Sequence, residues 1–398
     1  MRTYSSGCGH PVRRESGRSR ATRGARPSTD TSHEGRHLMN SSTLLRRLGV
    51  VATAAALVAG LGACGSSADP GSGNTLNVVV TTAAWSVETG SITLADRLGF
   101  LREEGVQATF STAKSGTEAA QQIIGGNADV AVATPEPVMI AAQQGTDLQY
   151  FMPFYGHVIY GLAAVPGSGI ASVADLRGKR VGVTNANSTG ATLLRTALKA
   201  EGMSEKDVTI VPIGVGAQQV TAVRGGDVDA LAMYDTLYTS LRSQDIAVTD
   251  IPVPGLDQLF GGGLLAQKSA LAENPEAYAK LGRAVAKALA WSRQHPEDAV
   301  RAVWDSKPET RPGPGQDEQK ALEDGVAMIE TRLGALIPDP QSTSWTEIDP
   351  ASVDRFADWA LGAGLITGKP PVEDVLDSGA GAAIGDFTPS EVRPSAGS

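Results

Sequence analysis

Two stretches that lie one hundred residues apart follow nearly the same pattern. Residues 124–134 read Ile-Gly-Gly-Asn-Ala-Asp and then Val-Ala-Val-Ala-Thr, and residues 224–234 read Arg-Gly-Gly-Asp-Val-Asp and then Ala-Leu-Ala-Met-Tyr. Each Gly-Gly pair suits a helix end, because glycine adopts the left-handed cap at little cost. Each apolar run suits a short strand that is covered on both faces. The repeat therefore predicts two similar α/β lobes, and small ligands bind in clefts between such domains.

The first 63 residues are expected to be a leader and not part of the fold. Arg46 and Arg47 precede an uncharged stretch, residues 48–61, which is followed by Gly-Ala and Cys64. This layout is typical of a bacterial lipoprotein signal and predicts lipidation of Cys64. An ordinary secretory signal with an incidental cysteine is the alternative. The apolar stretch is too short to span a bilayer comfortably.

The true start of the protein is expected at Met39, because residues 1–38 are rich in Arg, Ser and Gly and sit awkwardly before a signal. Residues 64–74 are expected to form a flexible Gly/Ser tether. No second long apolar run follows, so we expect contact with the membrane through the lipid anchor only.

Charge and cysteine content exclude several classes of partner. After residue 63 the chain holds 24 Lys and Arg against 40 Asp and Glu, a net charge of −16. Such an acidic chain repels nucleic acid and anionic lipid, so nucleic acid is not an expected partner. Besides Cys64 the only cysteine is Cys8, in the leader. We therefore expect no internal disulfide, no thiolate metal site and no cofactor.

Each copy of the repeat belongs to a strand–helix–strand–helix–strand unit, which predicts parallel strands with right-handed crossovers. The predicted strands of the first unit are residues 76–80, 106–110 and 129–133, with helices at 91–104 and 117–124. In the second unit they are 180–183, 208–213 and 229–233, with helices at 189–201 and 217–223. Residues 150–165 and 252–266 are expected to cross between the lobes, and Gly261–Gly263 would allow a hinge.

Two segments resemble a known family. Residues 95–106, Ala-Asp-Arg-Leu-Gly-Phe-Leu-Arg-Glu-Glu-Gly-Val, and residues 168–183, Ser-Gly-Ile-Ala-Ser-Val-Ala-Asp-Leu-Arg-Gly-Lys-Arg-Val-Gly-Val, resemble signatures of ABC-transporter solute-binding proteins. The group is the one that handles nitrate, sulfonates, taurine and thiamine pyrimidines. The resemblance covers residues 76–306 and implies a two-lobed type II periplasmic-binding-protein fold, with a mainly parallel sheet in each lobe. It places lobe 1 at 75–157 plus 262–377 and lobe 2 at 158–261. Residues 378–398 are rich in Gly, Ala, Pro and Ser and are expected to form a loose tail.

The resemblance implies a lipid-anchored receptor on the outer face of the bacterial cytoplasmic membrane. It would act as a monomer, close over a small solute, and deliver it to the permease and ATPase subunits of an ABC importer. The alternatives are an enzyme similar to thiamine-pyrimidine synthases and a sensor subunit for a membrane kinase. Those synthases carry a cysteine-rich iron-binding motif that this chain lacks, and no nucleophile–base pair is visible, so we expect no catalytic residue.

Candidate ligand-binding residues follow from the rule that ligands lie beyond the carboxyl ends of parallel strands. The loops at these positions contain Trp85, Ser115, Gly116, Thr134, Asn187, Ser188, Thr189, Gly216, Tyr234 and Asp235. His157, beside Tyr155 and Tyr160 on the crossing segment, is added; a hydrogen-bonded core histidine is its alternative. Trp85 either closes over a ligand or lies buried under the first helix. Of residues 187–189, one is expected to cap the helix that begins there, and the other two are expected to bind the ligand, through the N–H groups that favour an anion.

The charge of the ligand stays open at this point. The helix start at Ser188 favours an anion such as a sulfonate or a carboxylate. Asp235, if it points inward, favours a cation or an N–H donor such as an aminopyrimidine. No arginine has an obvious place near these loops for a bidentate sulfonate contact.

Overall fold

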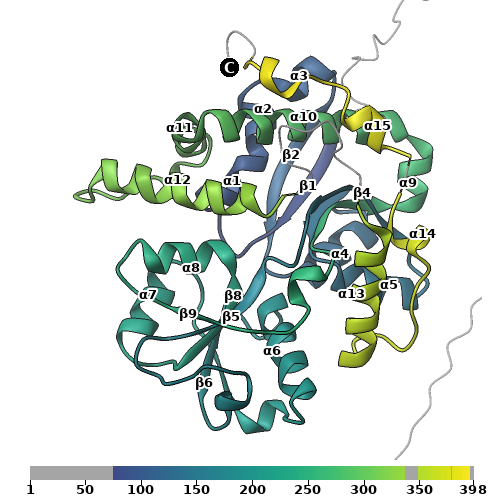
Figure 1. The fold of residues 1–398 in the computed structure, drawn as a ribbon. Helices are drawn as coiled ribbons and strands as arrows, with labels where there is room; N and C mark the ends of the chain where they lie inside the picture. Colours follow the sequence, from purple (N-terminus) through teal and green to yellow (C-terminus); the bar gives the residue numbers. More distant parts are fainter. Residues whose placement is uncertain (1–74, 337–347, 378, 395–398) are drawn as a thin grey trace, which may run out of the picture. The chain divides into compact units, whose positions relative to one another are not determined.

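Ten strands form two separate sheets (Figure 1). The computed structural model describes residues 75–336, 348–377 and 379–394, so the predictions for Cys64, the leader and the tether lie outside the described residues. The first sheet contains β1 (Thr75–Thr81), β2 (Gln107–Ala113), β3 (Val130–Ala133), β4 (Leu148–Tyr155) and β10 (Gly262–Gln267), in the order β2-β1-β3-β10-β4. The second contains β5 (Tyr160–Ala164), β6 (Arg180–Val183), β7 (Thr209–Pro212), β8 (Ala230–Tyr234) and β9 (Thr249–Ile251), in the order β7-β6-β8-β5-β9.

Four of the five strands in each sheet run in the same direction. In the first sheet β1 pairs in parallel with β2 and β3, while β10 is antiparallel to both β3 and β4. In the second, β6 pairs in parallel with β7 and β8, while β5 is antiparallel to both β8 and β9. The predicted parallel units are confirmed, and the one reversed strand in each sheet directly follows a crossing from the other sheet.

Helices cover both faces of each sheet. Those associated with the first sheet are α1 (Val87–Gly90), α2 (Leu94–Arg97), α3 (Phe100–Glu104), α4 (Gly116–Ile124), α5 (Glu136–Gln143), α9 (Lys268–Glu273), α10 (Pro275–Gln294), α11 (Pro296–Ser306), α12 (Glu318–Gly334), α13 (Pro350–Ala363), α14 (Val372–Val375) and α15 (Gly381–Ile384). The second sheet carries α6 (Thr189–Ala200), α7 (Ala217–Arg224) and α8 (Asp235–Arg242). We call each sheet with these helices the first lobe and the second lobe.

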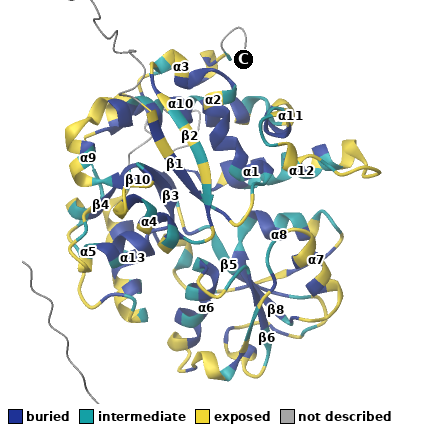
Figure 2. Ribbon diagram, turned by 180° about the vertical axis from the view of Figure 1, so that it is seen from behind, coloured by how far each residue is buried: buried dark blue, intermediate teal, exposed yellow. Residues whose placement is uncertain are grey.

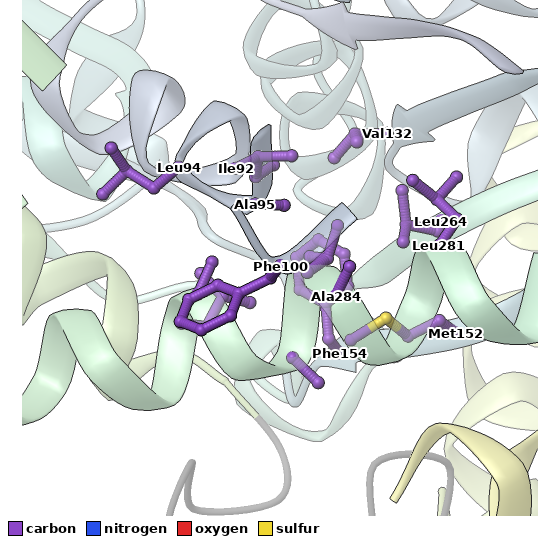
Figure 3. Close-up of a cluster of buried hydrophobic side chains, with 14 of the residues drawn as sticks. Ile92, Leu94, Ala95, Phe100, Val132, Met152, Phe154, Leu264, Leu281 and Ala284 are labelled. Atoms are coloured by element: carbon purple, nitrogen blue, oxygen red, sulfur yellow. The ribbon is translucent and has the colours of Figure 1, made fainter. Parts of the chain in front are cut away.

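The alternation of side chains along the strands explains the two-sided covering. Val78 and Val80 of β1 pack in one core with α3 and α10, while Val79 packs on the opposite face with α4, α5 and α13. Figure 3 shows part of the first of these cores, where Leu281 and Ala284 of α10 lie near residues of β4 and α3. The strands inside both sheets are buried, whereas the edge strand β2 shows exposed positions (Figure 2).

The prediction of a single helix over 91–104 is wrong. The structure has a 3₁₀ turn at Ser91–Thr93, then α2, then α3. Gly99 separates α2 from α3 with a φ of 81°, a left-handed conformation that ends regular helix geometry. An additional short helix, α1, precedes the turn and begins after Ser86.

The glycines at 261–263 allow a close approach of two backbones. A Cβ on Gly261 would overlap the carbonyl of His157, and one on Gly262 would overlap the carbonyl of Ala133. Gly262 also has a φ of 104°, which side chains disfavour. The crossing segments 156–159 and 252–261 therefore lie against each other where they pass between the lobes.

The prediction of a loose tail at 378–398 is also wrong, because residues 379–394 are packed. Ile384 of α15 is fully buried beside Gly282 of α10, and Val392 belongs to the same hydrophobic core. The Gly- and Ala-rich composition hid this, since a few apolar side chains are enough to anchor a short segment onto a long helix.

Ile384→Ala tests this packing. Removing a fully buried isoleucine side chain should lower the free energy of unfolding by about 2–5 kcal/mol, because it removes apolar contacts and leaves a cavity. The matched control is Ile124→Ala, since the Ile124 side chain is 43% exposed and its loss should change stability by about 0.5 kcal/mol or less. Equal urea midpoints for the two variants would contradict the packed C-terminal segment.

Candidate functional site

Several predicted residues surround a small cavity of about 20 Å³ between the lobes. The first lobe contributes Ser115 and Gly116 at the start of α4, and the second contributes Ser188, Thr189 and Tyr234. The hydroxyl of Ser115 accepts a hydrogen bond from the Glu118 N–H, and that of Ser188 accepts one from the Ala191 N–H, each at 3.2 Å. Both serines are therefore helix caps, which confirms the capping alternative for Ser188.

A second cavity, of about 40 Å³, adjoins the first; we call it the cleft cavity. The two share Thr81, Tyr160 and Tyr234 as lining residues. The cleft cavity is also lined by the predicted Thr134 and by polar or aromatic residues from α1, β4 and α12, namely Glu88, Thr89, Tyr155 and Arg332. Its remaining lining is apolar, from Val80, Ile92, Val132, Ala133 and Ile159.

Five predicted residues do not line either cavity. Trp85 packs against the core of the first lobe with the Lys307 ammonium 4.4 Å from its ring centroid, which favours the buried alternative. His157, Asn187 and Gly216 are exposed. Asp235 contacts the cleft cavity only indirectly, through Arg332.

Direct polar contacts join the two lobes around the cavities. The hydroxyls of Thr134 and Thr189 lie 3.0 Å apart, and the Asn185 amide donates to the Lys114 carbonyl at 3.1 Å. Thr239 of α8 and Thr331 of α12 form another hydroxyl pair at 2.9 Å. These contacts place the lobes in a closed arrangement in which few water molecules have room.

Arg332 is the centre of the polar network at the cleft cavity. Its guanidinium donates to the Asp235 carboxylate at 2.8 Å, to the Tyr155 hydroxyl at 3.1 Å and to the Thr236 hydroxyl at 3.3 Å. Thr236 in turn donates to the Glu88 carboxylate at 2.9 Å. Because Asp235 and Thr236 belong to the second lobe, this network ties helix α12 and helix α1 of the first lobe to helix α8.

Burial and charge set the protonation of these groups. Burial raises the pKa of Tyr155, Tyr160 and Tyr234, so all three phenols keep their protons. Burial also raises the pKa of Asp235, and the neighbouring Arg332 offsets part of this rise. For Arg332, burial acts to lower the pKa, but Asp235, Tyr155 and Glu88 outweigh it, so the guanidinium stays charged.

Glu136 is a buried carboxyl behind the cavities, at the start of α5. Burial raises its pKa, and hydrogen bonds from Thr134 and Thr189 offset this only in part. Its Oε2 atom has no hydrogen-bond partner among the described residues. The negative charge of Glu136 is therefore costly in the folded protein.

The sequence reasoning missed the charged residues of the site. Glu88 lies on α1, which was not predicted, and Arg332 lies on a C-terminal helix whose position depends on tertiary packing alone. Tyr155 and Tyr160 were noted as neighbours of His157 on the crossing segment, and the structure places these tyrosines, not the histidine, at the cleft cavity. The stretch after Trp85, Ser-Val-Glu-Thr-Gly-Ser at 86–91, carries no local signal that Glu88 is buried.

A larger hollow lies elsewhere, with a volume of about 650 Å³ between α9, α10 and residues 373–377 and 379–383. Its three cations are already paired, Lys268 with Asp374, Lys280 with Glu276, and Arg283 with Glu104. It also lies away from the carboxyl ends of the strands. We therefore assign the candidate site to the smaller cavities between the lobes.

Within 75–336, 348–377 and 379–394, no three His, Cys, Asp or Glu side chains are grouped so that they could hold a metal ion. In the part of the chain that the structure describes, no helix combines the length and apolar character needed to cross a bilayer.

Glu136→Gln should stabilise the protein in a pH-dependent way. Because the folded-state pKa is raised, the stabilising contribution of Glu136 is complete below its ordinary value of 4.5 and is lost as the pH rises through the folded-state value. Each unit of rise costs about 1.4 kcal/mol at neutral pH, a cost that the amide avoids. The variant should match the native chain at pH 4.5 and melt at least about 2 °C higher at pH 7.5.

The control for this prediction is Glu104→Gln, which should act in the opposite direction. Burial opposes ionisation of Glu104, but Arg283 and Lys287 bind its carboxylate and lower the pKa. Its stabilising effect is therefore present at neutral pH and lost in acid. A Glu136→Gln variant that melts lower than the native chain at pH 7.5 would refute the cost assigned to that charge.

Comparisons with known proteins agree with this architecture. The chain is 27% identical over 240 residues to the riboflavin-binding protein RibY of Chloroflexus aurantiacus, which covers 60% of this chain and 68% of RibY. Its structure is similar to that of the alkanesulfonate-binding protein SsuA of Xanthomonas axonopodis pv. citri, with a TM-score of 0.56 and 19% identity over 76% of this chain and 98% of SsuA. The desulfurization enzyme DSZB has a TM-score of 0.50 and 16% identity, over 77% of this chain and 97% of DSZB.

The family model for NMT1/THI5-like proteins matches residues 87–299 of the 398, which is more than half of the chain. This match confirms the resemblance deduced from residues 95–106 and 168–183. The two sheets flanked by helices agree with the fold of the structural neighbours. The chain thus belongs to the NMT1/THI5-like family and has the two-lobed type II periplasmic-binding-protein fold.

Proposed function

We propose that this protein is an extracytoplasmic receptor that closes over a small solute and delivers it to the permease and ATPase of an ABC importer. RibY and SsuA are named as binding proteins for riboflavin and alkanesulfonates, and this supports a binding role on the same fold. The observation that carries the proposal is in the cleft cavity: polar side chains of both lobes meet there, and buried atoms of Glu88 and Arg332 have no partner among the described residues.

Binding would work by hinge closure. The cleft cavity has about 40 Å³, room for on the order of three water molecules, so a larger solute needs the lobes to separate before it enters and to close around it less tightly than they do here. The crossing segments 156–159 and 252–261 are the proposed hinge, between lobe 1 at 75–157 plus 262–377 and lobe 2 at 158–261. A solute that contacts both lobes binds only the closed form and so stabilises it.

The proposal includes a location outside the cytoplasm, at the membrane. The structural similarity to the periplasmic sulphonate-binding protein SsuA of Escherichia coli supports this location, and the acidic chain after residue 63 does not favour direct contact with anionic lipid. Lipidation of Cys64 would then hold the receptor near its permease, as a monomer.

An engineered disulfide tests the closure. In a chain with Cys8→Ser and Cys64→Ser, the pair Thr134→Cys and Thr189→Cys should crosslink the lobes, because the native hydroxyls are 3.0 Å apart. A bound solute should speed crosslinking and reduce the radius of gyration in small-angle scattering. The solutes to screen are alkanesulfonates, taurine, nitrate, aminopyrimidines, riboflavin and purines; one at 100 times its Kd should stabilise the protein by about 2.7 kcal/mol.

The matched second pair is Thr239→Cys and Thr331→Cys, which joins the lobes through α8 and α12 instead. Both pairs should respond to the same solute, since one rigid movement would bring both together. Crosslinking rates and scattering profiles that no solute changes would refute the receptor proposal.

Cys64→Ser tests the anchor. Without the thiol no lipid can be attached, so we expect the variant to move from the membrane fraction to the soluble extracytoplasmic fraction of a bacterial host. Solute binding by the released protein should be unchanged, because the site is built from residues 80–332. Equal membrane association of the native and variant proteins would contradict lipidation at this cysteine.

A further inference from the structure

One wall of the cleft cavity holds a buried acceptor and a buried donor that the described residues leave unsatisfied. The Glu88 side chain is 3% exposed and its Oε2 has no partner, and Arg332 is 6% exposed and its Nε has none. Both residues line the cavity. They also share one neighbour, since the Thr236 hydroxyl donates to Glu88 Oε1 at 2.9 Å and accepts from Arg332 at 3.3 Å.

Buried polar atoms of this kind point to a ligand. A charged group without its hydrogen bonds is expensive in a protein interior, so such atoms are normally satisfied by protein, water or ligand. Glu88 Oε2 needs an N–H or O–H donor, and Arg332 Nε needs an acceptor. A solute with a donor and an acceptor on one edge would satisfy both at once.

The charge of the wall selects against anions. Arg332 is paired with Asp235 at 2.8 Å and is close to Glu88 through Thr236, so two carboxylates face one guanidinium. Of the other residues that line the two cavities, only Lys114 is a cation, and it is exposed. A sulfonate would bring a third negative charge to this wall, whereas a neutral solute would not.

The helix starts of α4 and α6 do not compensate for this. Their free N–H groups are an anion site only where they are unpaired. Here Ser115 and Ser188 already cap the two helices, and the Glu118 carboxylate accepts a hydrogen bond from the Lys114 N–H. The small cavity therefore offers an anion less than the sequence suggested.

The other walls suit a flat ring. Tyr155, Tyr160 and Tyr234 surround the cavity together with Val80, Ile92 and Ile159. Tyr160 and Tyr234 meet edge to face, with ring centroids 5.7 Å apart, and aromatic and apolar surfaces of this kind favour stacking with planar solutes.

We propose that Glu88 and Arg332 determine specificity by recognising the donor–acceptor edge of a neutral, planar nitrogen heterocycle, and that they select it against alkanesulfonates. The proposal rests on the receptor function above and names its solute class. Glu88 accepts from the ring N–H or amino group, Arg332 Nε donates to the adjacent ring nitrogen or carbonyl, and the tyrosines cover the ring.

Calorimetric titration of the full chain with defined probes tests the proposal. The heterocycles are riboflavin, uracil and 4-aminopyrimidine, and the anions are methanesulfonate and taurine. At least one heterocycle should bind at least ten times more tightly than either sulfonate. Glu88→Gln has the same shape but lacks the acceptor charge, and it should weaken binding of that heterocycle by about 10- to 100-fold.

Glu104→Gln is the control, because Glu104 is a buried carboxylate on α3 that binds Arg283 and Lys287 and does not line the cavities. It should leave the affinity for the heterocycle unchanged. Arg332→Lys keeps the positive charge but lacks Nε, and it should also weaken binding of the heterocycle. Loss of binding in both variants could then not be explained by a folding defect confined to the Glu88 variant.

The outcomes separate this proposal from the receptor function. Tighter binding of methanesulfonate or taurine, or a heterocycle affinity that Glu88→Gln leaves unchanged, would overturn the role of Glu88 and Arg332 while the receptor function stood. If no probe of either class binds and none changes the crosslinking of the Thr134→Cys and Thr189→Cys pair, the receptor function fails and this proposal fails with it.

Discussion

The closed arrangement of this protein depends on a buried guanidinium. Arg332 holds together α12, the crossing strand β4 through Tyr155, and helix α8 of the other lobe through Asp235. Leaving such a charge without partners costs far more than a surface ion pair gains. The lobes therefore cannot separate by a small amount at this point: as soon as Asp235 moves away, water or a solute must take its place. In the proposed receptor this interaction favours two distinct states, open and closed, over a continuous range.

The polar network and the order of the strands together determine where the site lies. Each sheet has one reversed strand, and each directly follows a crossing from the other lobe. Tyr160 begins one of these strands and pairs with Tyr234 at the end of β8, whereas Gly262 begins the other and lies against Ala133 at the end of β3. The carboxyl ends of β3 and β8 thus border both the crossings and the cavities, so movement at the crossings acts directly on the residues that would hold a solute.

Local patterns were enough to predict much of the fold but only part of the site. Short apolar runs and Gly-Gly stops gave β1, β3, β6 and β8 closely, because strand and cap preferences depend on neighbouring residues. Thr134, Ser188 and Tyr234 followed from the same rule, as residues at strand ends. Glu88 and Arg332 did not, since they reach the cavity through packing of α1 and α12 that no local pattern encodes. The buried Ile384 was missed for the related reason that its packing depends on α10, which is distant in the sequence.

The contact between the crossing segments has a mechanical consequence. At Gly261 the chain that returns to the first lobe touches the backbone of His157 in the chain that leaves it, with no space for a side chain between them. Two separate linkers would let one lobe twist, tilt and slide over the other. Linkers held together at one point leave chiefly rotation about a single axis through that point. The two lobes would then meet in the same register each time they close, and Arg332 would find Asp235 without a search.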